Sequence, residues 1–151
     1  MMFKTHLAMG VLASLFFVKS FSFEYPIFFI IVACFFSIFP DIDIPSSKIG
    51  RRTKPLSSIL NIMFGHRKLF HSLIFALIGF GFLISFFENW IGAAFLLGYF
   101  VHLGVDALTV MGIKPFYPLS SFRIHGILKT NGVMDYLLFF FIIIGIIVLV
   151  I

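Results

Sequence analysis

The chain has 151 residues, of which 61% are hydrophobic and only 11% are charged. A small domain exposes too much of its surface to hide that many apolar side chains from water, so the composition excludes a soluble globular protein. The net charge of +5 does not point to nucleic acid, because the basic residues flank apolar stretches, where they suit anionic lipid headgroups.

Five apolar stretches predict an all-α, multi-pass membrane bundle that forms one domain over residues 1–151. These stretches cover residues 5–18, 26–39, 69–87, 90–111 and 136–151. The third and fourth have the roughly 20 residues that cross a bilayer, and the other three need tilt or local membrane thinning. Pro26 suits the first turn of the second helix, and Pro40 is expected to end that helix.

Two longer polar connections separate these stretches, at residues 41–68 and 112–134. Within the first, residues 55–64 carry apolar side chains at helical spacing behind Arg51 and Arg52. That pattern is typical of a short helix lying on the membrane surface. Arg51 and Arg52 are therefore candidates for binding lipid headgroups or a substrate phosphate.

The placement of basic residues predicts how the bundle is oriented. With five crossings, the N-terminus and both polar connections fall on the same side of the membrane. Of the 11 Lys and Arg residues, only Lys19 falls on the opposite side. Because positive charge near helix ends stays in the cytoplasm, we expect a protein of the inner membrane with the charged side cytoplasmic.

Most His and Asp residues gather on this predicted cytoplasmic side. The candidate metal ligands are His6, Asp41, Asp43, His66, His71, His102 and Asp106. His102 and Asp106 are four residues apart in the fourth stretch, which places both on one side of a helix. A charged group inside a membrane costs roughly 3 kcal/mol on insertion scales. Either a divalent metal ion or a simple His–Asp ion pair would offset that cost.

Two further motifs favour the metal. Asp41 and Asp43 are two residues apart in a turn bounded by prolines. Two carboxylates so placed can bind one ion or bridge two. The alternative is a simple turn that ends the helix, because Pro and Asp are ordinary turn residues. His66 and His71 lie five residues apart across the start of the third stretch. A solvated loop position for His66 and a helix-cap position for His71 are the alternatives to metal binding.

These motifs resemble the YdjM-type family of membrane-bound metal-dependent hydrolases. The similar segments are Thr5-His6, Pro40-Asp41-Ile42-Asp43, Gly65-His66-Arg67, His71-Ser72, Gly98-Tyr99, His102, Asp106, Leu108-Thr109 and Pro118. The resemblance implies a helical protein with a His/Asp metal site, and a distant kinship with zinc-dependent phospholipase C and P1-type nucleases. The chain departs from the family pattern at Ile44, Lys68, Phe70 and Asp135. Those departures affect inferences about substrate more than those about metal ligands.

Together, the residues and the resemblance predict a metal-dependent hydrolase of a phosphoester, either a small molecule or a membrane lipid. We expect one to three divalent ions, with zinc favoured over manganese or magnesium. Asp135 is expected to orient a ligand or accept a proton, and Arg67 to pair with phosphate oxygens. Two alternatives stay open: a purely structural metal site, and transport of protons or metal ions.

Overall fold

The computed structural model describes residues 1–64 and 68–151, and in this part of the chain it contains helices but no β-strand. The bundle consists of α1 (Phe3–Ser20), α2 (Pro26–Phe36), α5 (Leu73–Phe86), α6 (Asn89–Ala107) and α7 (Val133–Val150). Between α2 and α5 lie η1 (Phe39–Asp43), α3 (Lys48–Arg52), α4 (Lys54–Phe64) and η2 (Leu69–His71), where η denotes a 3-10 helix. The predicted all-α membrane bundle is confirmed.

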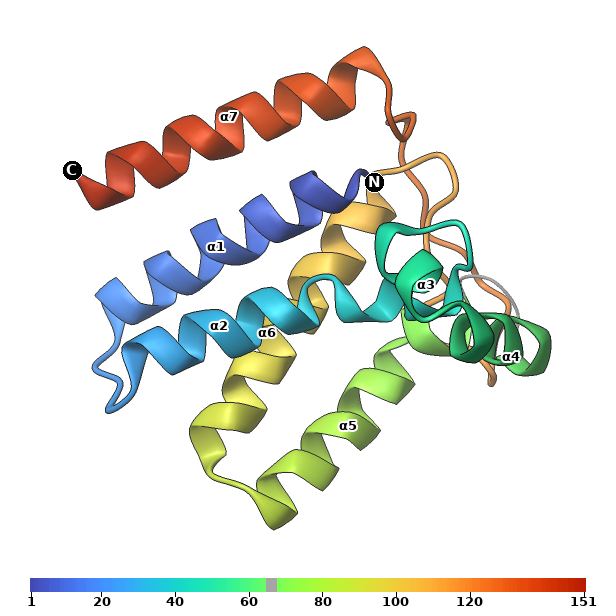
Figure 1. Cartoon of the computed structure of the whole chain (residues 1–151), viewed down its shortest axis with the longest axis horizontal. Helices are drawn as coiled ribbons and strands as arrows, with labels where there is room; N and C mark the ends of the chain where they lie inside the picture. Colours follow the sequence, from blue (N-terminus) through green and yellow to red (C-terminus); the bar gives the residue numbers. More distant parts are fainter. Residues whose placement is uncertain (65–67) are drawn as a thin grey trace.

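The helices of the bundle share one polar end. Each of them has one terminus at the end where the N-terminus, α3 and α4 lie (Figure 1). The loop between α6 and α7 also lies at this end, whereas the α1–α2 and α5–α6 turns lie at the other. The N-terminus and both polar connections therefore occupy the same end, as the count of five crossings requires.

Three segments of the described chain are long and apolar enough to cross a membrane: Pro26–Asp43, which joins α2 to η1, and the helices α6 and α7. The apolar helix α5 has only 14 residues, or about 21 Å at 1.5 Å per residue. A bilayer core is about 30 Å thick, so α5 needs flanking residues or local membrane thinning to cross it. The third helix is thus shorter than the range 69–87 predicted for it.

The shorter third helix has a local cause. Residues 69–87 were expected to form one helix, but α5 begins only at Leu73. The Ser72 hydroxyl accepts a hydrogen bond from the backbone N–H of Phe75 and so caps α5. The preceding residues Leu69–His71 form the separate turn η2, which directs the chain across the end of the bundle.

The second and fourth helices are also shorter than predicted. Helix α2 ends at Phe36 rather than at Pro40, and Pro40 instead lies within the first turn of η1. Helix α6 ends at Ala107 rather than at residue 111. In both places the apolar sequence continues past the helix end, so hydrophobicity alone misplaces the boundary. The turn η1 keeps its two aspartates buried at the end of the bundle.

The short helix α4 confirms the helix predicted over residues 55–64. Its side chains Leu56, Ile59 and Ile62 are 48%, 53% and 84% exposed, so α4 presents an exposed apolar face. Its position on the membrane surface stays a prediction.

Helix α6 packs against α1, α2 and α5. Gly98 of α6 lies against α2 so closely that a Cβ atom there would overlap the carbonyl oxygen of Ala33. Ala33 and Ala94 are fully buried in the same contact. Small residues thus allow the two helices to approach closely. His102 and Asp106 lie farther along the same helix and are fully buried.

We predict that Gly98→Ala lowers the apparent unfolding temperature in detergent by about 5 °C, because the new methyl group overpacks the α2–α6 contact. Gly104→Ala is the matched control, since a Cβ atom there meets no other atom within 4 Å. In an open helical position, alanine is expected to be neutral or stabilising. Equal unfolding temperatures for the two variants would contradict the close contact.

Candidate metal centre

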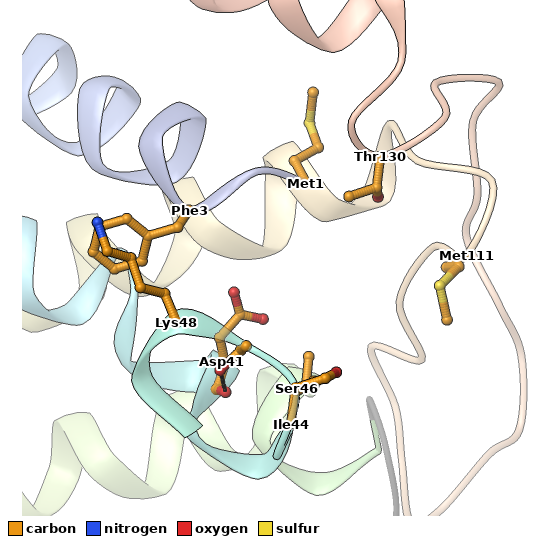
Figure 2. A pocket seen from close by; sticks show the side chains of 9 residues that line it. Met1, Phe3, Asp41, Ile44, Ser46, Lys48, Met111 and Thr130 are labelled. Atoms are coloured by element: carbon orange, nitrogen blue, oxygen red, sulfur yellow. Dashed lines mark hydrogen bonds between the residues drawn. The ribbon is translucent and has the colours of Figure 1, made fainter. Parts of the chain in front are cut away.

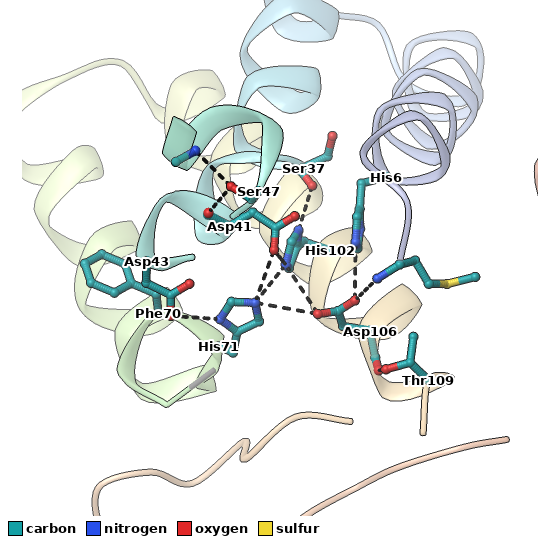
Figure 3. A network of polar contacts seen from close by, with 12 residues as sticks. His6, Ser37, Asp41, Asp43, Ser47, Phe70, His71, His102, Asp106 and Thr109 are labelled. Atoms are coloured by element: carbon teal, nitrogen blue, oxygen red, sulfur yellow. Dashed lines mark hydrogen bonds and ion pairs between the residues drawn. The ribbon is translucent and has the colours of Figure 1, made fainter. Parts of the chain in front are cut away.

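Four buried side chains from three segments converge at the polar end of the bundle (Figure 3). Asp41 comes from η1, His71 from η2, and His102 and Asp106 from α6. One nitrogen or carboxylate oxygen of each lies within 4.8 Å of those of the other three. Two imidazoles and two carboxylates match the donor set of Zn²⁺ and similar divalent ions. This four-residue cluster could therefore hold a metal ion.

The donor atoms of the cluster face one another. The Nε2 atoms of His71 and His102 are 3.2 Å apart. One carboxylate oxygen of Asp106 lies 3.6 Å from His71 Nε2 and 3.8 Å from His102 Nε2. One carboxylate oxygen of Asp41 lies 3.8 Å and 3.9 Å from the same two nitrogens. The predicted placement of His102 and Asp106 on one side of α6 is thereby confirmed.

Each of the two imidazoles also faces an oxygen atom on the side of the ring away from the cluster. His102 Nδ1 lies 2.8 Å from the carbonyl oxygen of Ser37, and because a carbonyl can only accept, Nδ1 carries the proton. The lone pair of Nε2 then points into the cluster. His71 Nδ1 lies 3.6 Å from a carboxylate oxygen of Asp43, again on the far side of the ring. Asp43 therefore lies behind His71, in the place where a carboxylate orients a metal-binding imidazole.

The turn η2 is positioned by α6 as well. The hydroxyl of Tyr99, one helical turn before His102, donates a hydrogen bond to the carbonyl oxygen of Phe70. Phe70 directly precedes His71, so this bond fixes the backbone that carries the imidazole. Tyr99 is fully buried among apolar side chains, and its hydroxyl is thereby satisfied.

His6 borders the cluster without belonging to the four-residue set. Its ring stacks on that of His102, with centroids 4.2 Å apart and planes inclined by 14°. Its Nε2 lies 3.3 Å from Asp106 Oδ1, which also accepts a hydrogen bond from the Met1 amino group at 2.6 Å. Among the described residues, His6 Nδ1 has no hydrogen-bond partner.

Asp135 joins the starts of α1 and α7. Its carboxylate accepts hydrogen bonds from the hydroxyl of Thr5 at 2.8 Å and from the backbone N–H groups of Met2 and Asn131 at 3.1 Å and 2.9 Å. Because Thr5 precedes His6, these bonds hold the start of α1 beside the cluster. The structure thus gives Asp135 a positioning role, and its predicted exchange of protons stays a prediction.

The electrostatics of the cluster favour a cation. Burial alone would lower the pKa of His71, but the carboxylates of Asp41 and Asp43 outweigh burial and raise that pKa to about 9. Without metal, His71 is therefore protonated at neutral pH and partly balances the carboxylates. A metal ion must displace this proton, so metal affinity is expected to fall as the pH is lowered.

The remaining predicted site residues are His66, Arg67, Arg51 and Arg52. His66 and Arg67 lie outside the described residues. Arg51 and Arg52 are exposed on α3, and their contacts with headgroups or phosphate stay a prediction.

A pocket of about 270 Å³ opens beside the cluster (Figure 2). Its lining consists of Met1, Phe3, Asp41, Ile44, Ser46, Ser47, Lys48, Met111 and Thr130. Asp41 belongs to both pocket and cluster, and its side chain is 11% exposed, whereas the side chains of His71, His102 and Asp106 are fully buried. The cluster therefore meets this pocket through Asp41.

Comparison with known proteins supports the motif resemblance. Residues 1–151 match the family described as YdjM inner membrane protein. The chain belongs to the YdjM family. Its helical bundle, its apolar spans and this membership together make it a membrane protein.

Relatives of this YdjM-family chain come from several bacteria. It is 42% identical over 91 residues to the uncharacterized protein YvsG of Bacillus subtilis (strain 168), a match that covers 59% of the chain and 56% of YvsG. It is 38% identical over 103 residues to the inner membrane protein YdjM of Escherichia coli (strain K12), covering 63% of the chain and 52% of that protein. The chain thus spans about half the length of these curated relatives. No solved structure matches it.

We predict that Asp43→Asn weakens zinc binding by about 10- to 100-fold, because the variant loses the carboxylate behind His71 but keeps the four-residue cluster. His102→Ala removes a donor atom and is expected to weaken binding further. The measurement is zinc titration of the purified protein against a competing chelator. His125→Ala, an exposed residue outside the cluster, is the control and should bind zinc like the parent chain. Wild-type affinity in both cluster variants would contradict the assignment.

Proposed function

We propose that this YdjM-family protein is a membrane-embedded, metal-dependent hydrolase that acts on a phosphoester at the cytoplasmic face of the membrane. The observation that carries the proposal is the junction of the four-residue cluster with the pocket, made by the partly exposed Asp41. Catalytic metal sites keep a coordination position open to substrate, whereas structural sites are closed. A cluster that borders a pocket fits the catalytic type.

The residues that would hold the ion are drawn from Asp41, His71, His102 and Asp106. Three of these four would hold a single Zn²⁺ with its fourth position open, with Mn²⁺ or Mg²⁺ as alternatives. The fit rests on the orientation of the imidazoles, since the Ser37 carbonyl leaves the His102 Nε2 lone pair directed at the other donors. A bound divalent ion would act as a Lewis acid and make water a stronger nucleophile at neutral pH.

The protein's own groups would supply orientation and proton transfer. Asp43 and the Ser37 carbonyl keep the two imidazoles in place, so the site needs little reorganisation during turnover. His6 is buried beside Asp106, and its Nδ1 has no hydrogen-bond partner in the described part of the chain, so this atom is available to take up a proton released near the cluster. Burial of the cluster limits competing water and strengthens these electrostatic contacts.

The cytoplasmic orientation is supported by charge. The polar end of the bundle carries the N-terminus, α3, α4 and the α6–α7 loop (Figure 1), and with them nearly all Lys and Arg residues of the chain. Membrane lipids are the partners expected at this end, where Arg51 and Arg52 would meet anionic headgroups. The substrate would be a lipid phosphoester or a small one reaching the membrane surface, and no nucleic acid is expected.

A structural metal site is the second candidate function. The cluster joins η1, η2 and α6, so an ion there would hold three separate segments together. This role requires neither a pocket nor an unpartnered His6 Nδ1, and both features therefore favour catalysis. Transport has less support, because a proton or metal ion would need polar side chains along its whole path through the membrane. The buried His and Asp side chains of the described residues gather at one end of the bundle.

We predict that the zinc-loaded protein hydrolyses a phosphoester such as bis(p-nitrophenyl) phosphate, and that removing zinc with a chelator abolishes the activity. His6→Ala should retain stoichiometric zinc but lose activity by about 100-fold, because the variant lacks the proton-accepting imidazole. His125→Ala is the control and should be fully active. If the chelator lowers thermal stability while neither synthetic nor phospholipid phosphoesters are cleaved before its addition, the metal is structural and the hydrolase proposal fails.

A further inference from the structure

The pocket beside Asp41 combines two kinds of lining. Ser46, Ser47, Lys48 and Thr130 supply hydroxyl and ammonium groups, while Met1, Phe3, Ile44 and Met111 are apolar. A pocket for a free inorganic anion needs no apolar lining, and one for a pure hydrocarbon needs no ammonium group. The mixture fits a ligand with a charged head and an apolar chain.

Among the described residues, Lys48 is the one basic side chain that lines this pocket. Its Nζ lies 4.7 Å from the centroid of the Phe3 ring, at the flank of the pocket (Figure 2). An exposed lysine on a four-carbon stem can turn its ammonium group toward an incoming anion at little cost. Lys48 is therefore placed to bind negative charge near the cluster without belonging to it.

The backbone fixes Lys48 relative to the cluster. The hydroxyl of Ser47 donates a hydrogen bond to the carbonyl oxygen of Asp41 at 2.8 Å and accepts one from the N–H of Gly50 at 2.8 Å. These bonds join the start of α3 to Asp41, whose carboxylate borders the pocket. The distance between Lys48 and the cluster is thus set by the turn, and only the side chain of Lys48 remains adjustable.

We infer that this pocket binds the phosphate group of an alkyl phosphoester together with the first carbons of its chain. Lys48 contributes the charge that holds the phosphate beside Asp41, and Met111 and Ile44 contact the chain. At about 270 Å³ the pocket is near the lower limit of small-molecule sites, roughly 300 Å³, so it suits the junction of headgroup and tail rather than a whole lipid. This inference rests on the proposed function and names its substrate class.

The test is calorimetric binding of butyl phosphate and of inorganic phosphate to the zinc-loaded protein in detergent. The parent chain is expected to bind butyl phosphate more tightly than inorganic phosphate. Lys48→Ala should weaken the binding of both by about tenfold, and Lys48→Arg should largely restore it, because a charge-assisted contact is lost and then replaced. Met111→Ala should weaken the binding of butyl phosphate only. Lys54→Ala, which changes a lysine outside the pocket lining, is the control.

Each part of the inference can fail separately. Unchanged affinities in Lys48→Ala, or no binding of either ligand by the parent chain, would overturn the phosphate site. Equal binding of butyl phosphate and inorganic phosphate by the parent chain would overturn the apolar subsite. A different result would contradict the proposed hydrolase activity. In that case butyl phosphate binding would still depend on Lys48, but no phosphoester would be cleaved.

Discussion

The burial of two imidazoles and two carboxylates at the end of an apolar bundle is the constraint on which the rest of the structure depends. Such groups are costly to remove from water unless they are paired or hold a cation. His102 and Asp106 lie within a membrane-spanning helix and are fully buried. The free-energy cost of burying them must therefore be offset by polar groups from other segments. Asp41 and His71 arrive from two separate turns, and a divalent cation would satisfy all four at once.

Several features that would otherwise look unrelated follow from this constraint. Gly98 and Ala33 let α2 approach α6 closely, which brings η1 and its aspartates to the cluster. The Ser72 cap ends η2 before α5 begins, which leaves His71 on a turn rather than in a helix. On the opposite side, the hydrogen bonds of Asp135 hold the start of α1, and with it the imidazole that stacks on His102. Packing and site chemistry thus depend on the same few contacts.

The sequence predicts the broad fold because lipid makes hydrophobic runs easy to recognise. It also predicts which polar residues meet, since the parity of five crossings assigns His6, Asp41, His71 and Asp106 to one end. Helix ends are predicted less well, because the apolar runs continue through the Pro40 and Ser72 turns. The orienting Ser37 carbonyl has no sequence signal, because every residue carries one. The sequence likewise does not show that Asp41 lies in the cluster while Asp43 lies behind His71, because the two aspartates are only two residues apart.

If the four-residue cluster binds a metal ion through both imidazoles, X-ray absorption at the zinc edge of the zinc-loaded protein will show it. We expect a first shell of nitrogen and oxygen at about 2.0 Å with the multiple-scattering signature of two imidazoles. That signature should be lost in the His71→Ala, His102→Ala double variant. A spectrum without imidazole scattering, or one unchanged in the double variant, would contradict binding through both imidazoles.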